Sequence, residues 1–74
     1  MKTEEQLKQI YSKNLRKRLD ARGVSPYFLA QQIGIMPRTV YLYLNADSLP
    51  NSYYLYLIAN FFGCSLDEMF EEKE

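Results

Sequence analysis

Hydrophobic side chains recur at three- and four-residue spacing over residues 4–22, which predicts a long amphipathic helix. Thr3 is a suitable N-cap residue, and Gly23 is suited to end the helix in the left-handed conformation. The apolar positions that form the stripe are Leu7, Ile10, Tyr11, Leu15 and Leu19.

Two shorter helical patterns follow, over residues 26–33 and about 37–45, and they meet at Gly34. Two short helices joined by a tight turn are typical of a helix-turn-helix, which places this motif at residues 26–45. Each helix has one apolar face, formed by Leu29, Ala30 and Ile33 in the first and by Val40, Tyr43 and Leu44 in the second.

Both short helices begin with a proline, Pro26 in the first and Pro37 in the second. The first helical position accepts proline readily because its N–H has no partner inside the helix. Ser25 is a good N-cap for the first of them, whereas Met36 is a weak N-cap for the second.

The remaining residues predict a loop at 46–50, a very apolar helix from residue 51 or 52 to residue 62, and a last turn at 66–70 capped by Ser65. The chain contains neither a strand pattern nor a repeat. We therefore expect an all-α fold of five helices, forming a single domain over residues 1–74.

Charge is segregated along the 74-residue chain, although the net charge is zero. Residues 1–45 contain eight Lys and Arg against three Asp and Glu, a net +5, and residues 46–74 contain one against six, a net −5. The basic half holds the helix-turn-helix, which suits a surface that faces phosphate. The alternative is an ordinary solvated charged face on the first helix.

The composition argues against several other classes of protein. The chain has no histidine and one cysteine, Cys64, which excludes a zinc cluster and an internal disulfide. It has neither an activated nucleophile pair nor a glycine-rich phosphate loop, so we expect no enzymatic activity, cofactor or small-molecule substrate. No apolar run approaches the roughly 20 residues of a membrane span, and the polar N-terminus is unlike a signal peptide, so a cytoplasmic location is expected.

The order of residues resembles the Cro/C1-type (XRE) helix-turn-helix family of phage repressors and bacterial regulators over about residues 14–70. The residues that stand at the family's spacings are Leu15, Gly23-Val24-Ser25, Leu29-Ala30, Gly34-Ile35, Thr39-Val40, Asn45, Pro50, Leu55, Ile58-Ala59, Gly63 and Ser65 to Phe70. The resemblance implies a compact lambda-repressor-like domain, bacterial or phage-encoded. It also implies a transcriptional regulator, expected to be a repressor, that binds a palindromic operator in double-stranded DNA as a homodimer.

The family's base-reading positions, carried over residue by residue, fall on Met36, Pro37, Arg38, Tyr41 and Leu42. Arg38 is the best candidate, because its planar fork can donate two hydrogen bonds to the O6 and N7 edge of guanine. The alternative is an ordinary surface arginine. Leu42 suits a thymine methyl group and Tyr41 a phosphate, although both equally suit a docking patch for a protein.

Contacts to phosphate are expected from first-helix cations, from hydroxyl groups at the start of the second helix and from the end of the third. These residues are Lys13, Arg16, Lys17, Ser25, Tyr27 and Asn45. Two departures from the family weaken this surface: Pro26 stands where a glutamine usually clamps a phosphate, and Asp47 lies in a loop that is often basic.

A third departure concerns a buried ion pair that the family often forms between an arginine and a glutamate. Leu19 and Leu44 occupy those two positions here, so we expect a hydrophobic contact in its place, a replacement that is often neutral or stabilising.

Tyr53, Leu57 and Phe61 form an apolar stripe on the fourth helix, in the region through which the family commonly dimerises. The alternative is that Leu7 and Ile10 fold back and cover this stripe. The main rival function is a helix-turn-helix used as a protein-binding module, antirepressor-like or antitoxin-like, with weak or no DNA binding. The neutral net charge and the surplus of apolar side chains favour this rival.

Overall fold

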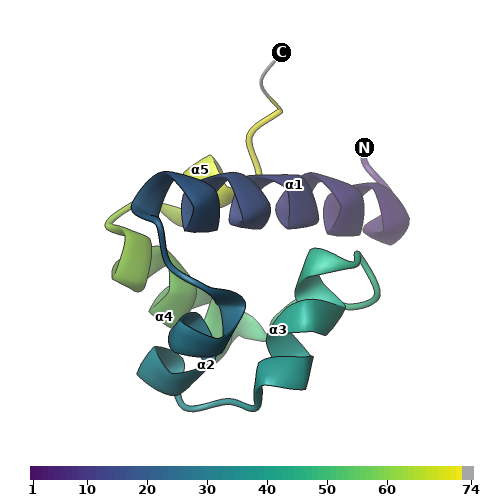
Figure 1. The fold of residues 1–74 in the computed structure, drawn as a ribbon. Coiled ribbons are helices and arrows are strands. Elements are labelled where there is room, and N and C mark those ends of the chain that lie inside the picture. The colour runs from purple at the N-terminus through teal and green to yellow at the C-terminus, as the bar shows by residue number, and fades with distance from the viewer. Residues whose placement is uncertain (73–74) are drawn as a thin grey trace.

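The computed structural model describes residues 1–72. Within them the helices are α1 (Glu4–Arg22), α2 (Pro26–Ile33), α3 (Pro37–Leu44), α4 (Ser52–Phe62) and α5 (Leu66–Met69). Helix α1 lies across the top of the molecule, with α2, α3 and α4 below it, and the N-terminus and the described residues after α5 above it (Figure 1). The all-α prediction and the positions of all five helices are confirmed.

Local hydrogen bonds explain why the helices begin where they do. Thr3 and Gln6 form a capping box at the start of α1, in which each side chain accepts from the other residue's backbone N–H. Ser65 and Glu68 form the same arrangement before α5. Met36, by contrast, makes no side-chain hydrogen bond to α3, as its apolar side chain predicts.

Helix α3 ends in a left-handed residue that is not glycine. Ala46 has φ 61°, and its N–H donates to the Tyr43 carbonyl at 3.2 Å while the Asp47 N–H donates to the Leu42 carbonyl at 2.9 Å. This is the Schellman arrangement, which glycine fits best. Ala46 therefore holds a conformation that costs an L-residue about 1–2 kcal/mol.

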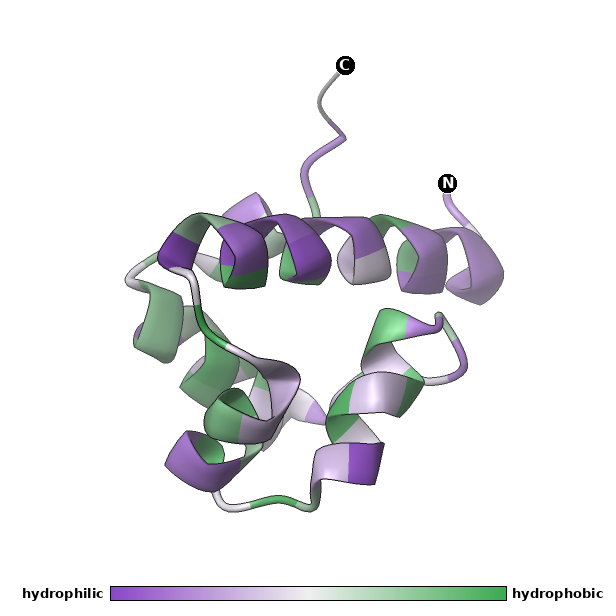
Figure 2. Cartoon of the chain, in the orientation of Figure 1, coloured by the Kyte–Doolittle hydropathy of each residue, from purple (hydrophilic) through white to green (hydrophobic). Residues whose placement is uncertain are grey.

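The core lies between the lower face of α1 and the inner faces of α2, α3 and α4, where the apolar residues gather (Figure 2). Leu19 and Leu44 both belong to it, at 3% and 6% exposure, so the prediction that Leu44 is buried is confirmed. The other buried apolar residues are Tyr11, Leu15, Leu29, Ala30, Ile33, Val40, Tyr43, Ile58, Ala59 and Met69.

One core side chain carries an unsatisfied polar atom. Tyr11 is fully buried, and within residues 1–72 its hydroxyl has no hydrogen-bond partner. Its ring lies 5.2 Å from that of Phe70. Burial, together with the nearby Tyr43 and Cys64, raises the pKa of the Tyr11 phenol, because the ionised form is poorly solvated there.

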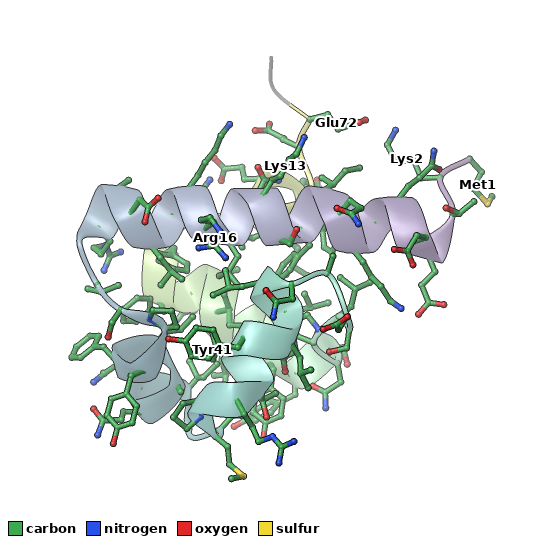
Figure 3. The ribbon with its side chains drawn as sticks, turned by 45° about the vertical axis from the view of Figure 1, so that its right-hand side comes forward. Met1, Lys2, Lys13, Arg16, Tyr41 and Glu72 are labelled. Atoms are coloured by element: carbon green, nitrogen blue, oxygen red, sulfur yellow. The ribbon has the colours of Figure 1, made fainter. Side chains whose placement is uncertain are left out.

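The C-terminal segment is attached to the upper side of α1. The Asn14 side-chain amide donates to the carbonyls of Met69 and Glu71, each at 2.8 Å, and so closes the end of α5. Lys2 pairs with Glu72 at 2.6 Å. These contacts hold the last described residues on the side of α1 opposite to α3 (Figure 3).

No helix within residues 1–72 combines the length and the apolar character needed to cross a membrane. The same residues contain no group of three or more His, Cys, Asp or Glu arranged to hold a metal ion.

Candidate nucleic-acid interface

The turn between α2 and α3 determines how α3 is presented. Gly34 has φ 80°, and its N–H and that of Ile35 both donate to the Ala30 carbonyl, at 2.9 and 3.0 Å. Ala30 is fully buried, and its small side chain lets α3 pack closely against α2. As a result, the N-terminal end of α3 projects from the bottom of the molecule, far from α1 (Figure 1).

One face of α3 is buried and the opposite face is open. The buried residues are Val40, Tyr43 and Leu44. The residues predicted to read bases lie together on the other side, and we call them the outward face of α3: Met36, Pro37, Arg38, Tyr41 and Leu42. Met36 is 64%, Tyr41 49% and Leu42 41% exposed, Arg38 is exposed, and Pro37 is half-buried.

Arg16 is one of the cations predicted to contact phosphate. In Figure 3 it lies above Tyr41 of α3, on the side of α1 that faces the viewer. It borders a shallow hollow together with Asp20 and Leu44. Arg16 is therefore close to the C-terminal end of α3, and an acidic side chain lies beside it.

Lys13 and Lys17 lie farther round α1 than Arg16. Both line a hollow of about 360 Å³ on the upper side of α1, which the C-terminal residues Glu71 and Glu72 also line. Figure 3 shows Lys13 near Glu72, turned away from α3. Both lysines also line the shallow hollow beside Arg16, Asp20 and Leu44, at the C-terminal end of α3. No residue of the outward face of α3 lines this hollow.

The segregation of charge along the sequence does not become one basic surface. Arg22 donates to the Phe61 carbonyl at 2.9 Å and lies 5.0 Å from the Phe61 ring, at the end of α4. Lys2 and Lys8 face the carboxylates of Glu72 and Glu4, at 2.6 and 3.9 Å. A long helix distributes its cations around its circumference, so these cations lie on more than one side of the molecule.

The predicted hydroxyl and amide donors lie near the ends of α2 and α3. The Ser25 oxygen accepts from the Phe28 N–H at 3.0 Å and so caps α2, which leaves the hydroxyl hydrogen able to donate. Tyr27, two residues after Ser25, is 57% exposed, and Asn45 is exposed at the C-terminal end of α3. All three side chains can reach an external acceptor.

The stripe on α4 is open only in part. Tyr53 is 63% exposed, whereas Leu57 and Phe61 are half-buried against the core. Phe61 is covered by Arg22 and by Phe28, whose ring lies 6.2 Å from it. Of the two residues in the alternative cover, Leu7 and Ile10, Ile10 lies instead beside the hollow on the upper side of α1.

Tyr56 is 60% exposed on α4 and was not among the predicted partner residues. It follows Tyr53 by three residues, which places the two side chains on the same side of the helix. The three-residue spacing from Tyr53 is the sequence signal from which the position of Tyr56 on this side of α4 could have been predicted.

The comparisons with known proteins agree with this geometry. The family model described as helix-turn-helix matches residues 15–69. Among solved structures, the chain is similar to the SOS-response transcriptional repressor LexA from Eubacterium rectale, with 22% identity and a TM-score of 0.87 over 92% of this chain and 72% of that one. This likeness shows a shared fold. No curated protein sequence matches the chain.

Proposed function

The chain belongs to the Cro/C1-type helix-turn-helix family, and from this premise we propose that it is a transcriptional regulator that binds double-stranded DNA in a sequence-specific manner. The observation that carries the proposal is the division of α3 into a buried face and an exposed one that holds Arg38. The similar solved structure is described as a transcriptional repressor, and we include repression in the proposal.

In this proposal α3 enters the major groove with its N-terminal end first, as recognition helices do. The exposed guanidinium of Arg38 donates two hydrogen bonds to O6 and N7 of a guanine. A pair of this kind contributes about 1–3 kcal/mol of discrimination between bases. Arg38 is therefore the residue on which sequence preference depends most.

Phosphate contacts come from residues that flank the groove. Arg16, Ser25, Tyr27 and Asn45 are exposed around the two ends of the helix-turn-helix and supply charge or hydrogen-bond donors. Lys13 and Lys17 add to the long-range attraction from the edge of α1. Log affinity then falls with log salt at a slope of about −0.9 for each phosphate neutralised.

We include a homodimer in the proposal, formed through the open part of α4. Tyr53 and Tyr56 are exposed there, and the sequence of α4 from Ser52 to Phe62 contains no charged residue. Two copies of this helix can therefore meet about a two-fold axis without repulsion between like charges. The palindromic operator would have half-sites about 10–10.5 base pairs apart.

The test is to select bound duplexes from a random pool and compare their affinity with that of scrambled duplexes by fluorescence anisotropy. The unmodified chain should prefer the selected duplexes, and Arg38→Ala should lose most of that preference. Lys2→Gln is the control, because it removes one positive charge on the side of α1 opposite to α3. Equal affinity for selected and scrambled duplexes in the unmodified chain would contradict the proposal.

A second candidate function is a protein-binding module, antirepressor-like or antitoxin-like. The observation that favours it is the exposure of Met36, Tyr41 and Leu42 on the outward face of α3, since exposed apolar patches often mark protein interfaces. A mobility-shift assay with random duplex at low salt separates the two candidates. The absence of a shift at micromolar protein would favour the protein-binding module.

A further inference from the structure

The outward face of α3 has an unusual chemistry for a surface that reads bases. Met36 and Leu42 are 64% and 41% exposed and Pro37 is half-buried, and none of these side chains has a strong hydrogen-bond donor or acceptor. Arg38 and Tyr41 are the two polar members of the set. Most of this surface can therefore contact a base edge only through carbon or sulfur.

This chemistry selects among the four bases. In the major groove, adenine is read by the amide of Asn or Gln and cytosine by a carboxylate acceptor, and residues 36–42 contain none of these side chains. Thymine is the base that presents an apolar group there, its C5-methyl. We propose that Leu42 and Met36 select thymine through this methyl group, beside the guanine bound by Arg38; this inference rests on the proposed DNA-binding function.

Helix geometry indicates where the thymine lies. Leu42 follows Arg38 by four residues, which corresponds to about 6 Å along α3 at about 1.5 Å per residue. Successive bases along a strand are about 3.4 Å apart. The thymine contacted by Leu42 is therefore expected within about two base pairs of the guanine.

The experiment uses a duplex selected by the unmodified chain from a random pool. Each thymine near the preferred guanine is replaced, one at a time, by deoxyuridine, which differs only by the missing C5-methyl group. We expect affinity to fall about fourfold where a methyl is contacted, which corresponds to about 0.8 kcal/mol for burial of one methyl-sized group. Substitutions at thymines farther from the guanine should have no effect.

Variants then assign the contact to a residue. Leu42→Ala should have equal affinity for duplexes that carry thymine or deoxyuridine at the position contacted by Leu42. Met36→Ala should show the same equality at the position contacted by Met36. Leu66→Ala is the matched control, because Leu66 is 44% exposed but lies on α5. It should retain the fourfold difference.

The outcomes separate this inference from the proposed function. If every deoxyuridine substitution is neutral while Arg38→Ala still abolishes sequence preference, thymine selection is overturned and the function stands. If the methyl effect persists in both Leu42→Ala and Met36→Ala, the assignment to these residues is overturned. If the unmodified chain selects no sequence at all, both proposals are overturned.

Discussion

The unpartnered hydroxyl of Tyr11 makes the substitution Tyr11→Phe a sharp test of the core. The Tyr11 ring is fully buried and within residues 1–72 its oxygen meets no donor or acceptor. Phenylalanine keeps the ring, including its position 5.2 Å from the Phe70 ring, and removes only that oxygen. The substitution should therefore stabilise the protein.

The expected size follows from two opposing effects. A buried polar group without a partner costs about 1–3 kcal/mol, and this cost disappears with the oxygen. The oxygen also makes van der Waals contacts worth about 0.1–0.2 kcal/mol each, which the variant loses. The net gain should be about 1 kcal/mol, or about 4–8 °C in melting temperature for a domain of this size.

Urea denaturation followed by circular dichroism at pH 7 measures the change. Tyr56→Phe is the control, because Tyr56 is 60% exposed and its hydroxyl is in contact with solvent; its effect should stay within about 0.5 kcal/mol. A loss of about 1 kcal/mol or more in Tyr11→Phe would refute the reasoning. It would mean that the hydroxyl has a partner in solution, such as a buried water molecule.

The same variant carries a pH signature. Burial raises the pKa of Tyr11 above its ordinary value of about 10. Above pH 10 the unfolded chain therefore releases this proton while the folded chain keeps it, so stability falls as pH rises, by about 1.4 kcal/mol per pH unit. Tyr11→Phe removes this contribution, and its advantage over the unmodified chain should widen between pH 10 and 11.

Three further predictions concern stability and use the same urea titration. Leu19→Arg places a charge at a position that is 3% exposed within the apolar core and should cost about 3–5 kcal/mol; an unchanged melting curve would contradict the assigned burial. Ala46→Gly relieves the left-handed φ of 61° and should stabilise by about 0.5–1 kcal/mol, whereas a loss would mean that the turn differs. Asn14→Ala removes two hydrogen bonds of 2.8 Å to carbonyls at the end of α5, including that of Met69, and should cost about 1–2 kcal/mol; no loss would show that the clamp is absent in solution.

Local signals made the helices predictable from the sequence. Thr3, Ser25 and Ser65 each bond a backbone N–H three residues ahead, and Gly34 ends α2 by its own conformation. Such contacts depend on neighbouring residues, so a sequence pattern is enough to detect them. The buried and exposed faces of α3 were predictable for the same reason, because helical periodicity alone separates Val40 from Arg38.

Contacts between distant residues could not be read in this way. Asn14 bonds the Met69 carbonyl 55 positions away, and Arg22 bonds the Phe61 carbonyl 39 positions away. Both hydrogen bonds depend on how the helices pack against one another, which no local sequence pattern determines. Nothing in the sequence around Ala46 indicated that a residue other than glycine would take the left-handed position.

The central claim is that Arg38 reads a guanine from the outward face of α3. The most direct measurement is the affinity of the unmodified chain and of Arg38→Ala for a selected duplex in which one guanine is replaced by 7-deazaguanine, which lacks only the N7 acceptor. The affinity of the unmodified chain should fall about fivefold, or by roughly 1 kcal/mol, which is the lower end of the value of such a pair of hydrogen bonds. The affinity of Arg38→Ala should be the same for the guanine and the 7-deazaguanine duplex. The claim would be contradicted if both proteins lost affinity equally, or if neither lost affinity at any guanine that is replaced.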